Sequence, residues 1–241
     1  MALGRVDGSP RGVLLDAFGT LVTLDAPAPL VRALLAQRLG VVVTRAQAGA
    51  AFAAEVAYYR AHMHEGTDGG RVAQLRARCA EVLRAALPPD PALQAADGAV
   101  MTAILTDALR WRVYPDAAPA LVRLRAAGLR VAVASNWDVS LVDVLEHCGL
   151  GELLDGVVTS AAVGAAKPDP RPLQSALELA GVAAADAVHV GDSLEEDVGA
   201  ARAAGVRPVL LVRSGQPPLG QTPPGVSVIG SLAQLPALLG L

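Results

Sequence analysis

Short apolar runs alternate with segments of helical periodicity through most of this chain, and this alternation limits its fold more than any other feature. Alternating strands and helices build a parallel sheet, because each strand returns to the sheet through a helical crossover. We therefore expect an α/β fold, a doubly wound parallel sheet with a Rossmann-like core. The expected strands cover residues 13–15, 129–134, 157–158, 187–190, 208–212 and 226–229.

One long segment, residues 25–112, interrupts the alternation. It is rich in alanine, and its larger apolar residues recur at helical spacing with no strand pattern among them. Gly40 is expected to end one of its helices, and Thr44 is expected to cap the next. We expect two domains: an α/β core of residues 1–24 and 113–241, and an all-helical domain of residues 25–112.

Composition narrows the class of function. Hydrophobic residues make up 53% of the chain and charged residues 18%, which is typical of a globular protein. The net charge of −3, the 3% of aromatic residues and the lack of a basic run argue against a nucleic-acid partner. No apolar run approaches the ~18 residues of a membrane span. Residues 1–7 lack the apolar core of a signal peptide, and Cys79 and Cys148 cannot form a disulfide framework. We therefore expect a cytoplasmic protein with no membrane partner.

Polar side chains stand where four of the expected strands end. Asp16 follows the first strand, Ser135 and Asn136 follow the second, Lys167 lies in the loop after the third, and Asp192 follows the fourth. The carboxyl ends of parallel strands open on one edge of the sheet, so these groups are expected to converge there. An aspartate at the end of a strand can serve as a nucleophile, although Asp16 by itself is as readily interpreted as the start of a turn.

Taken in order, these motifs resemble those of the haloacid dehalogenase superfamily. The resemblance covers the whole chain, and the helical segment resembles the cap domain that the family carries after its first strand. It implies a hydrolase that acts on a small anionic substrate. The matching stretches are Asp16-Ala17-Phe18-Gly19-Thr20, Ser135-Asn136, Lys167-Pro168, and Gly191-Asp192-Ser193 with Asp197.

The resemblance implies a role for each motif. Asp16 would attack the substrate and form an aspartyl intermediate, which water later hydrolyses. Lys167 would keep Asp16 ionised and neutralise an anionic substrate. The expected substrate-binding residues are Thr20, Ser135, Asn136 and Trp137, although Trp137 also suits a packed core position. His189 lies inside an apolar strand and is expected to be a core histidine rather than a metal ligand.

The fourth motif suggests a metal ion. Mg²⁺ binds few carboxylates and keeps several water ligands, which suits Asp192. In the phosphatases that this chain resembles, the metal also takes the backbone carbonyl two residues after the nucleophile, which is Phe18 here. We expect Mg²⁺ to bind Asp16, the Phe18 carbonyl and Asp192. Asp197 would orient the loop or bind the metal through water, and the alternatives for that role are Glu195 and Glu196.

Two motifs point to different members of the superfamily. Most of the phosphatases carry a second aspartate, a general acid and base, where this chain has Phe18, and in this the chain resembles the dehalogenases. The dehalogenases, however, carry serine in place of Asp192 and tyrosine in place of Leu173. We give Asp192 more weight, because two ionised carboxylates side by side are costly without a cation.

The sequence therefore predicts a Mg²⁺-dependent phosphatase, a monomer or a homodimer, that acts on a small phosphorylated metabolite through an aspartyl-phosphate intermediate. Two alternatives stay open. One is a 2-haloacid dehalogenase that uses the same Asp16 without a metal, and the other is a catalytically idle binding protein with the same fold.

Overall fold

The computed structural model describes residues 10–213 and 224–241 of the chain. The prediction that concerns a signal peptide falls on residues 1–7 and lies outside this range. The chain divides into two compact units. The first consists of Met1–Thr23, Val113–Trp137 and Leu141–Leu241, and the second of Leu24–Arg112 with Asp138–Ser140.

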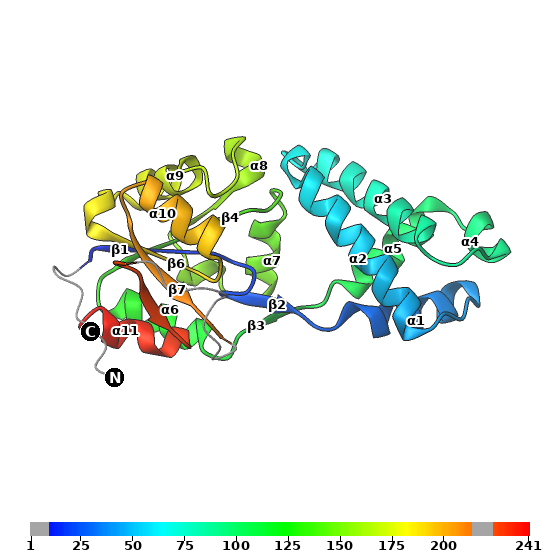
Figure 1. Cartoon of the computed structure of the whole chain (residues 1–241), viewed down its shortest axis with the longest axis horizontal. Helices are drawn as coiled ribbons and strands as arrows, with labels where there is room; N and C mark the ends of the chain where they lie inside the picture. Colours follow the sequence, from blue (N-terminus) through cyan, green and yellow to red (C-terminus); the bar gives the residue numbers. More distant parts are fainter. Residues whose placement is uncertain (1–9, 214–223) are drawn as a thin grey trace. The chain divides into compact units, whose positions relative to one another are not determined.

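The first unit is built on a six-stranded sheet with the strand order β5-β4-β1-β6-β7-β8, in which every pairing is parallel (Figure 1). The central strands β1 and β6 are buried along their whole length, as expected of strands covered on both faces. These findings confirm the doubly wound parallel α/β fold. The strands are β1 (Gly12–Leu15), β4 (Arg130–Ser135), β5 (Gly156–Thr159), β6 (Ala187–Gly191), β7 (Arg207–Leu211) and β8 (Ser227–Ile229).

Helices cover both faces of this sheet. Figure 1 shows α9 and α10 on one side and α6 and α11 on the other. The face under α9 is filled by small and branched apolar residues, among them Leu14, Leu173 and Leu177. The helices of this unit are α6 (Ala117–Ala126), α7 (Leu141–His147), α8 (Ser160–Val163), α9 (Arg171–Ala180), α10 (Gly199–Ala203) and α11 (Leu235–Leu238), with short helices η2 (Gly151–Leu153), η3 (Ala184–Asp186), η4 (Leu194–Val198) and η5 (Leu232–Gln234).

The strand register brings the motif residues to one edge. Leu15, the last residue of β1, lies beside Val133 of β4 and Val190 of β6. Asp16 therefore leaves the sheet at the level where β4 and β6 also end. The sequence predicted this convergence from the parallel topology alone, since parallel strands carry their carboxyl ends to one edge.

The second unit is mainly helical. Thr44 caps α2 through a capping box with Gln47, and Gly40 ends α1 with a φ of +69°. Its core contains Leu75, Leu83 and Ile104. The helices are α1 (Pro27–Leu39), α2 (Arg45–His62), η1 (Met63–Glu65), α3 (Gly69–Ala85), α4 (Pro91–Ala95) and α5 (Gly98–Ala108). Within the described ranges, no helix is both long and apolar enough to span a membrane.

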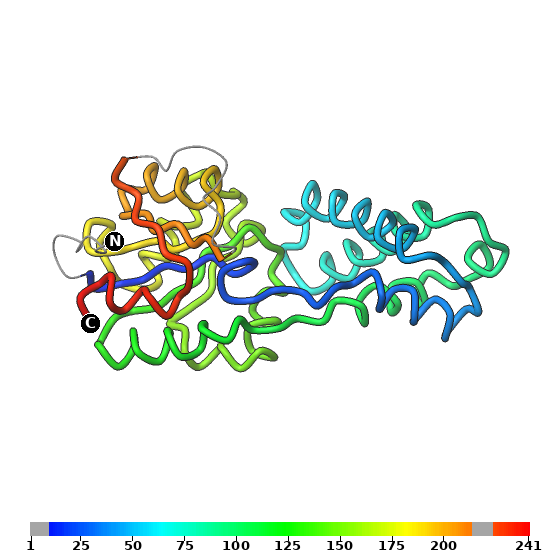
Figure 2. The backbone as a smooth tube through the Cα atoms, turned by 60° about the horizontal axis from the view of Figure 1, so that its bottom comes forward, coloured from blue at the N-terminus to red at the C-terminus, as the bar shows by residue number. Residues whose placement is uncertain are grey.

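Two features of this unit differ from the sequence-based expectation. The expected lack of strands in residues 25–112 is wrong at the C-terminal end, where Trp111 and Arg112 belong to β3 (Trp111–Val113). This strand pairs with β2 (Val22–Leu24), and Figure 2 shows the two segments side by side. In addition, the segment Asp138–Ser140 groups with the helices. The Asp138 carboxylate accepts hydrogen bonds from Tyr59 and Arg76, both 3.0 Å long. These contacts join residues far apart in the chain, and helical periodicity carries no information about them.

Candidate active site

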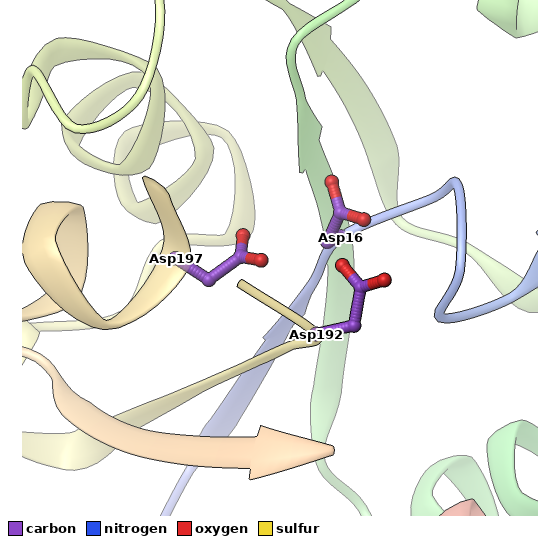
Figure 3. Close-up of side chains that lie close together, drawn as sticks. All are labelled: Asp16, Asp192 and Asp197. Atoms are coloured by element: carbon purple, nitrogen blue, oxygen red, sulfur yellow. The ribbon is translucent and has the colours of Figure 1, made fainter. Parts of the chain in front are cut away.

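Three carboxylates gather at the carboxyl edge of the sheet. Asp16 follows β1, Asp192 follows β6, and Asp197 lies in η4. Each offers an oxygen that lies within 4.8 Å of the others, so the group could hold a metal ion. Figure 3 shows the carboxylates of Asp16 and Asp192 side by side, with Asp197 reaching toward them from its helix.

Two motif glycines let these carboxylates approach the backbone. A Cβ on Gly19 would lie 2.0 Å from an Asp192 oxygen, and a Cβ on Gly191 would lie 2.1 Å from the carboxyl carbon of Asp197. Gly19 also has a φ of +82°, a conformation that side chains with a Cβ rarely adopt. Both glycines are therefore required by the close packing of the acidic residues.

Lys167 lies between two of the acids. Its Nζ donates to Asp16 Oδ1 at 2.7 Å and to Asp197 Oδ1 at 2.5 Å, and its side chain is 1% exposed. Burial alone would lower the pKa of Lys167, but the charges of Asp16 and Asp197 outweigh burial and raise it. For Asp197, burial would raise the pKa, but Lys167 and His189 outweigh it and lower the pKa well below the usual range. The Lys167–Asp197 pair is therefore ionised.

The pKa values of Asp16 and Asp192 are both raised by their surroundings. Burial raises the pKa of Asp16, and the Lys167 ammonium opposes that rise. Loss of water contacts, together with the charges of Asp16 and Asp197, raises the pKa of Asp192 to about 6. When all three carboxylates are ionised, the single Lys167 ammonium balances only one of their charges, so the raised pKa values reflect a site that lacks positive charge. The site is thus suited to a divalent cation.

Asp197 already accepts hydrogen bonds from three groups of the protein. His189 Nε2 and Lys167 Nζ both contact its Oδ1, the former at 3.0 Å, and the Ser193 amide donates to its Oδ2 at 3.0 Å. His189 is 1% exposed, and within the described ranges no group hydrogen-bonds to its Nδ1. His189 therefore lies in the core, as expected, with one of its two ring nitrogens hydrogen-bonded. Asp197 contacts Lys167 directly and fixes its position.

Ser135, the last residue of β4, and Asn136, which follows it, orient the nucleophile and the lysine. Ser135 Oγ donates to Asp16 Oδ1 at 2.9 Å. Asn136 contacts the backbone of Lys167 twice: Nδ2 donates to the carbonyl at 2.9 Å, and Oδ1 accepts from the amide N–H at 2.7 Å. Its Nδ2 also donates to Glu196 Oε2 at 3.1 Å. Since these contacts join loops after different strands, they hold the lysine loop against the end of β4.

The remaining predicted substrate-binding residues are buried. Trp137 is 4% exposed, and its backbone N–H donates to Ser160 Oγ at 3.1 Å. Thr20 is fully buried, and its Oγ1 has no hydrogen-bond partner among the described residues. Phe18, by contrast, is 41% exposed and meets the Trp137 ring edge-on with centroids 6.5 Å apart. The Phe18 ring, two residues after Asp16 in the chain, is therefore partly open to solvent.

Sequence reasoning missed one residue that contacts the site. Arg213, two residues beyond β7, donates to the Gly19 and Thr20 carbonyls from Nε and Nη2. The one feature of the sequence that could have indicated Arg213 is its place near the end of a parallel strand, since residues at the ends of other strands form the site. No motif spacing identifies it.

Comparison with known proteins supports the relationship indicated by the motifs. The family model of the haloacid dehalogenase-like hydrolases matches residues 10–205. The chain is 34% identical over 205 residues to haloacid dehalogenase-like hydrolase domain-containing protein 3 of Mus musculus, covering 83% of this chain and 80% of the relative. It is 46% identical over 101 residues to the Bos taurus protein of the same name, covering 42% of this chain and 40% of the relative.

A third relative is the plasmid-encoded phosphoglycolate phosphatase of Cupriavidus necator, 43% identical over 130 residues, which are 53% of this chain and 55% of that protein. The match thus spans 40% of the bovine relative and 55% of the Cupriavidus relative, about half of each.

Solved structures of two activities share the fold. A haloacid dehalogenase-like phosphatase from Thermococcus onnurineus superposes with a TM-score of 0.66 at 26% identity, covering 95% of this chain and 98% of that one. A 2-haloacid dehalogenase from Pseudomonas syringae pv. Tomato superposes with a TM-score of 0.65 at 26% identity, covering 96% and 98%. With the family model matched from β1 to the end of α10, this chain belongs to the haloacid dehalogenase-like hydrolases.

Proposed function

We propose that this hydrolase is a Mg²⁺-dependent phosphatase that acts on a small phosphorylated metabolite. The observation that carries the proposal is Asp192 beside Asp16: their carboxylates share one edge of the sheet, and burial together with their mutual repulsion raises the pKa of Asp192, a repulsion that a bound cation would relieve. The phosphoglycolate phosphatase of Cupriavidus necator and the Thermococcus phosphatase support the same chemistry.

The residues present fit a divalent cation. Asp197 is occupied by Lys167, His189 and Ser193, so Asp16 and Asp192 are the carboxylates left to hold Mg²⁺, with the Phe18 carbonyl as a third oxygen. Mg²⁺ needs no more protein ligands than these, because it keeps several waters. When bound, the ion supplies positive charge that stabilises the negative charge of the transferring phosphoryl group.

The protein groups around Asp16 suit nucleophilic catalysis. Lys167 and Ser135 both donate to Oδ1, so Oδ2 is the oxygen that these two donors leave to attack phosphorus. The bond from phosphorus to the leaving oxygen breaks, and an aspartyl phosphate forms. Water then attacks phosphorus, releases inorganic phosphate and restores the Asp16 carboxylate. Lys167 compensates negative charge at each step.

Phe18 limits which substrates react well. The side chain at this position cannot donate a proton to the leaving oxygen, and a general acid typically contributes ~10²–10⁴-fold. Phosphate esters with acidic leaving groups are therefore the preferred substrates. On this proposal the helical segment 25–112 acts as the cap that selects among them, and Thr20, Ser135, Asn136 and Trp137 shape the site.

A second candidate is a 2-haloacid dehalogenase, which the exposed Phe18 ring against Trp137 and the Pseudomonas dehalogenase favour. Halide leaves without a proton donor, so Phe18 would be no handicap. The charge of Asp192 argues against this candidate, because an ionised carboxylate without a cation would repel both the nucleophile and a carboxylate substrate.

Release of phosphate from an aryl phosphate and of chloride from 2-chloropropionate, each with Mg²⁺ and with EDTA, separates the candidates. We expect phosphate release that needs Mg²⁺ and no chloride release. Asp16→Asn is the control: it should lose turnover while its thermal midpoint stays equal or rises, since one crowded charge is removed. Chloride release in EDTA would favour the dehalogenase, and no turnover of either substrate would favour an idle protein.

A further inference from the structure

Arg213 makes four contacts around the turn that follows the nucleophile. Its Nε donates to the Gly19 carbonyl at 2.9 Å, and its Nη2 donates to the Thr20 carbonyl at 2.5 Å. Its Nη1 donates to Asp116 Oδ2 at 2.9 Å, and its Cζ lies 3.6 Å from the centre of the Tyr114 ring. One guanidinium thus joins the end of β7 to the turn after β1 and to the segment after β3.

The turn after the nucleophile is closed by backbone hydrogen bonds around a glycine. Its amides at Thr20, Leu21 and Val22 all point to the Ala17 carbonyl, at 3.3, 2.8 and 3.0 Å. Gly19, with its φ of +82°, allows the next peptide unit to rotate at little steric cost. The carbonyls of Gly19 and Thr20 belong to the peptide units that such a rotation would turn, and Arg213 holds both of them.

The guanidinium is itself held firmly. Asp116 Oδ2 also accepts from Ser231 Oγ at 2.6 Å and from the Leu232 amide at 2.8 Å. The side chains of Arg213 and Asp116 are 20% and 15% exposed, so this ion pair is largely shielded from solvent. The planar fork of arginine matches two successive carbonyls and a carboxylate at once, a geometry that the point charge of lysine does not reproduce.

We propose that Arg213 is a positioning residue of the reaction, which fixes the turn of residues 17–22 so that the Phe18 carbonyl and Thr20 keep their places beside Asp16. Arg213 lies outside the matched family region and outside all four motifs. It acts through the backbone of Gly19 and Thr20 rather than by touching substrate. Its effect on catalysis rests on the proposed function, whereas its effect on the turn does not.

Hydrogen exchange of the full-length protein tests the turn directly. Arg213→Lys and Arg213→Met are compared with Arg123→Met, which removes an exposed arginine of α6 in the same unit. We expect the amides of Thr20, Leu21 and Val22 to exchange at least about tenfold faster in both Arg213 variants, the factor expected when hydrogen bonds from a charged group are lost. The strands β4 and β6 and the Arg123→Met protein should exchange as in the wild type.

Kinetics with an aryl phosphate give the second measurement. Both Arg213 variants should need about 10–100-fold more Mg²⁺ for half-maximal rate, the range found when groups that orient ligands are removed. At saturating Mg²⁺ the KM for the aryl phosphate should change by less than about twofold, since Arg213 does not contact substrate. If Arg213→Met fails to fold, Arg213→Lys, which keeps a charge for Asp116, decides the result.

Unchanged exchange in residues 17–22, or equally faster exchange across β4 and β6, would overturn the proposal, because Arg213 would then have no local effect. Full activity of Arg213→Lys at wild-type Mg²⁺ would also overturn it. A wild-type protein without phosphatase turnover would instead refute the proposed function, and the exchange data would still decide the role of Arg213.

Discussion

The carboxylate of Asp192 packs directly against the Cα of Gly19, where a Cβ would lie 2.0 Å from one of its oxygens. The first and fourth motifs are therefore coupled by contact as well as by chemistry. A side chain at position 19 would displace Asp192 or move the turn, and either change would alter the oxygens next to Asp16.

Gly19→Ala tests this contact, and Gly128→Ala is a matched control. Both glycines have a φ near +80°, at +82° and +80°, but a Cβ on Gly128 would meet no atom within 4 Å. Both variants should lose about 1–2 kcal/mol of unfolding free energy from the left-handed conformation. Only Gly19→Ala should raise the Mg²⁺ needed for half-maximal rate, by about 10–100-fold. Equal Mg²⁺ dependence in the two variants, measured by rate against Mg²⁺, would show that Asp192 tolerates the new methyl group.

The pKa of Asp192 predicts how the metal-free protein responds to pH. Because this pKa is raised to about 6, the folded protein holds a proton that the unfolded chain, with an ordinary aspartate, has already lost. The contribution of Asp192 to stability therefore falls as pH rises from about 4 to about 6, and this loss persists above that range. In EDTA, the thermal midpoint of the wild type should therefore decline relative to that of Asp192→Asn as pH rises through this range. Identical pH profiles for the two proteins would contradict the raised pKa.

Arg76 and Arg78 on α3 offer a matched pair for the helical unit. Arg76 pairs with Asp138, whose side chain is 0% exposed, whereas Arg78 pairs with Glu65 at the surface. Arg76→Met should cost about 3–5 kcal/mol of unfolding free energy, since it leaves a buried carboxylate without its counter-charge. Arg78→Met should change the thermal midpoint little, because exposed ion pairs contribute little. Chemical denaturation of both variants checks the contrast. Equally small losses would mean that Tyr59 and the Ser140 amide, which donates to Asp138 Oδ1 at 2.8 Å, satisfy Asp138 by themselves.

Phe18 predicts a strong dependence on the leaving group. Without a proton donor at this position, an aryl phosphate with an acidic phenol should turn over far faster than an alkyl phosphate of similar size. The wild-type rate across a series of phenols and alcohols measures this dependence. Phe18→Asp should raise the alkyl rate by up to ~10²-fold if the new carboxyl reaches the leaving oxygen. A flat series, with chemistry shown to limit the rate, would mean that another residue supplies the proton.

The sequence by itself determined the fold class and the place of the main charges. Apolar runs such as 13–15 identified the strands, because a strand buried on both faces carries mostly apolar side chains. The parallel topology then placed Asp16, Lys167 and Asp192 on one edge without any knowledge of side-chain contacts. The sequence also predicted the helix end at Gly40 and the helix start at Thr44, since capping depends on neighbouring residues only.

The tertiary structure alone decided which partner each polar group takes. Asn136 could be identified as a site residue but not as the residue that holds the Lys167 backbone, and His189 could be placed in the core but not against Asp197. Arg213 reaches a turn 194 residues earlier in the chain, and Trp111 joins a strand because β2 lies beside it. Local sequence patterns report the periodicity of burial, whereas these contacts depend on the folded path that brings distant residues within hydrogen-bonding distance.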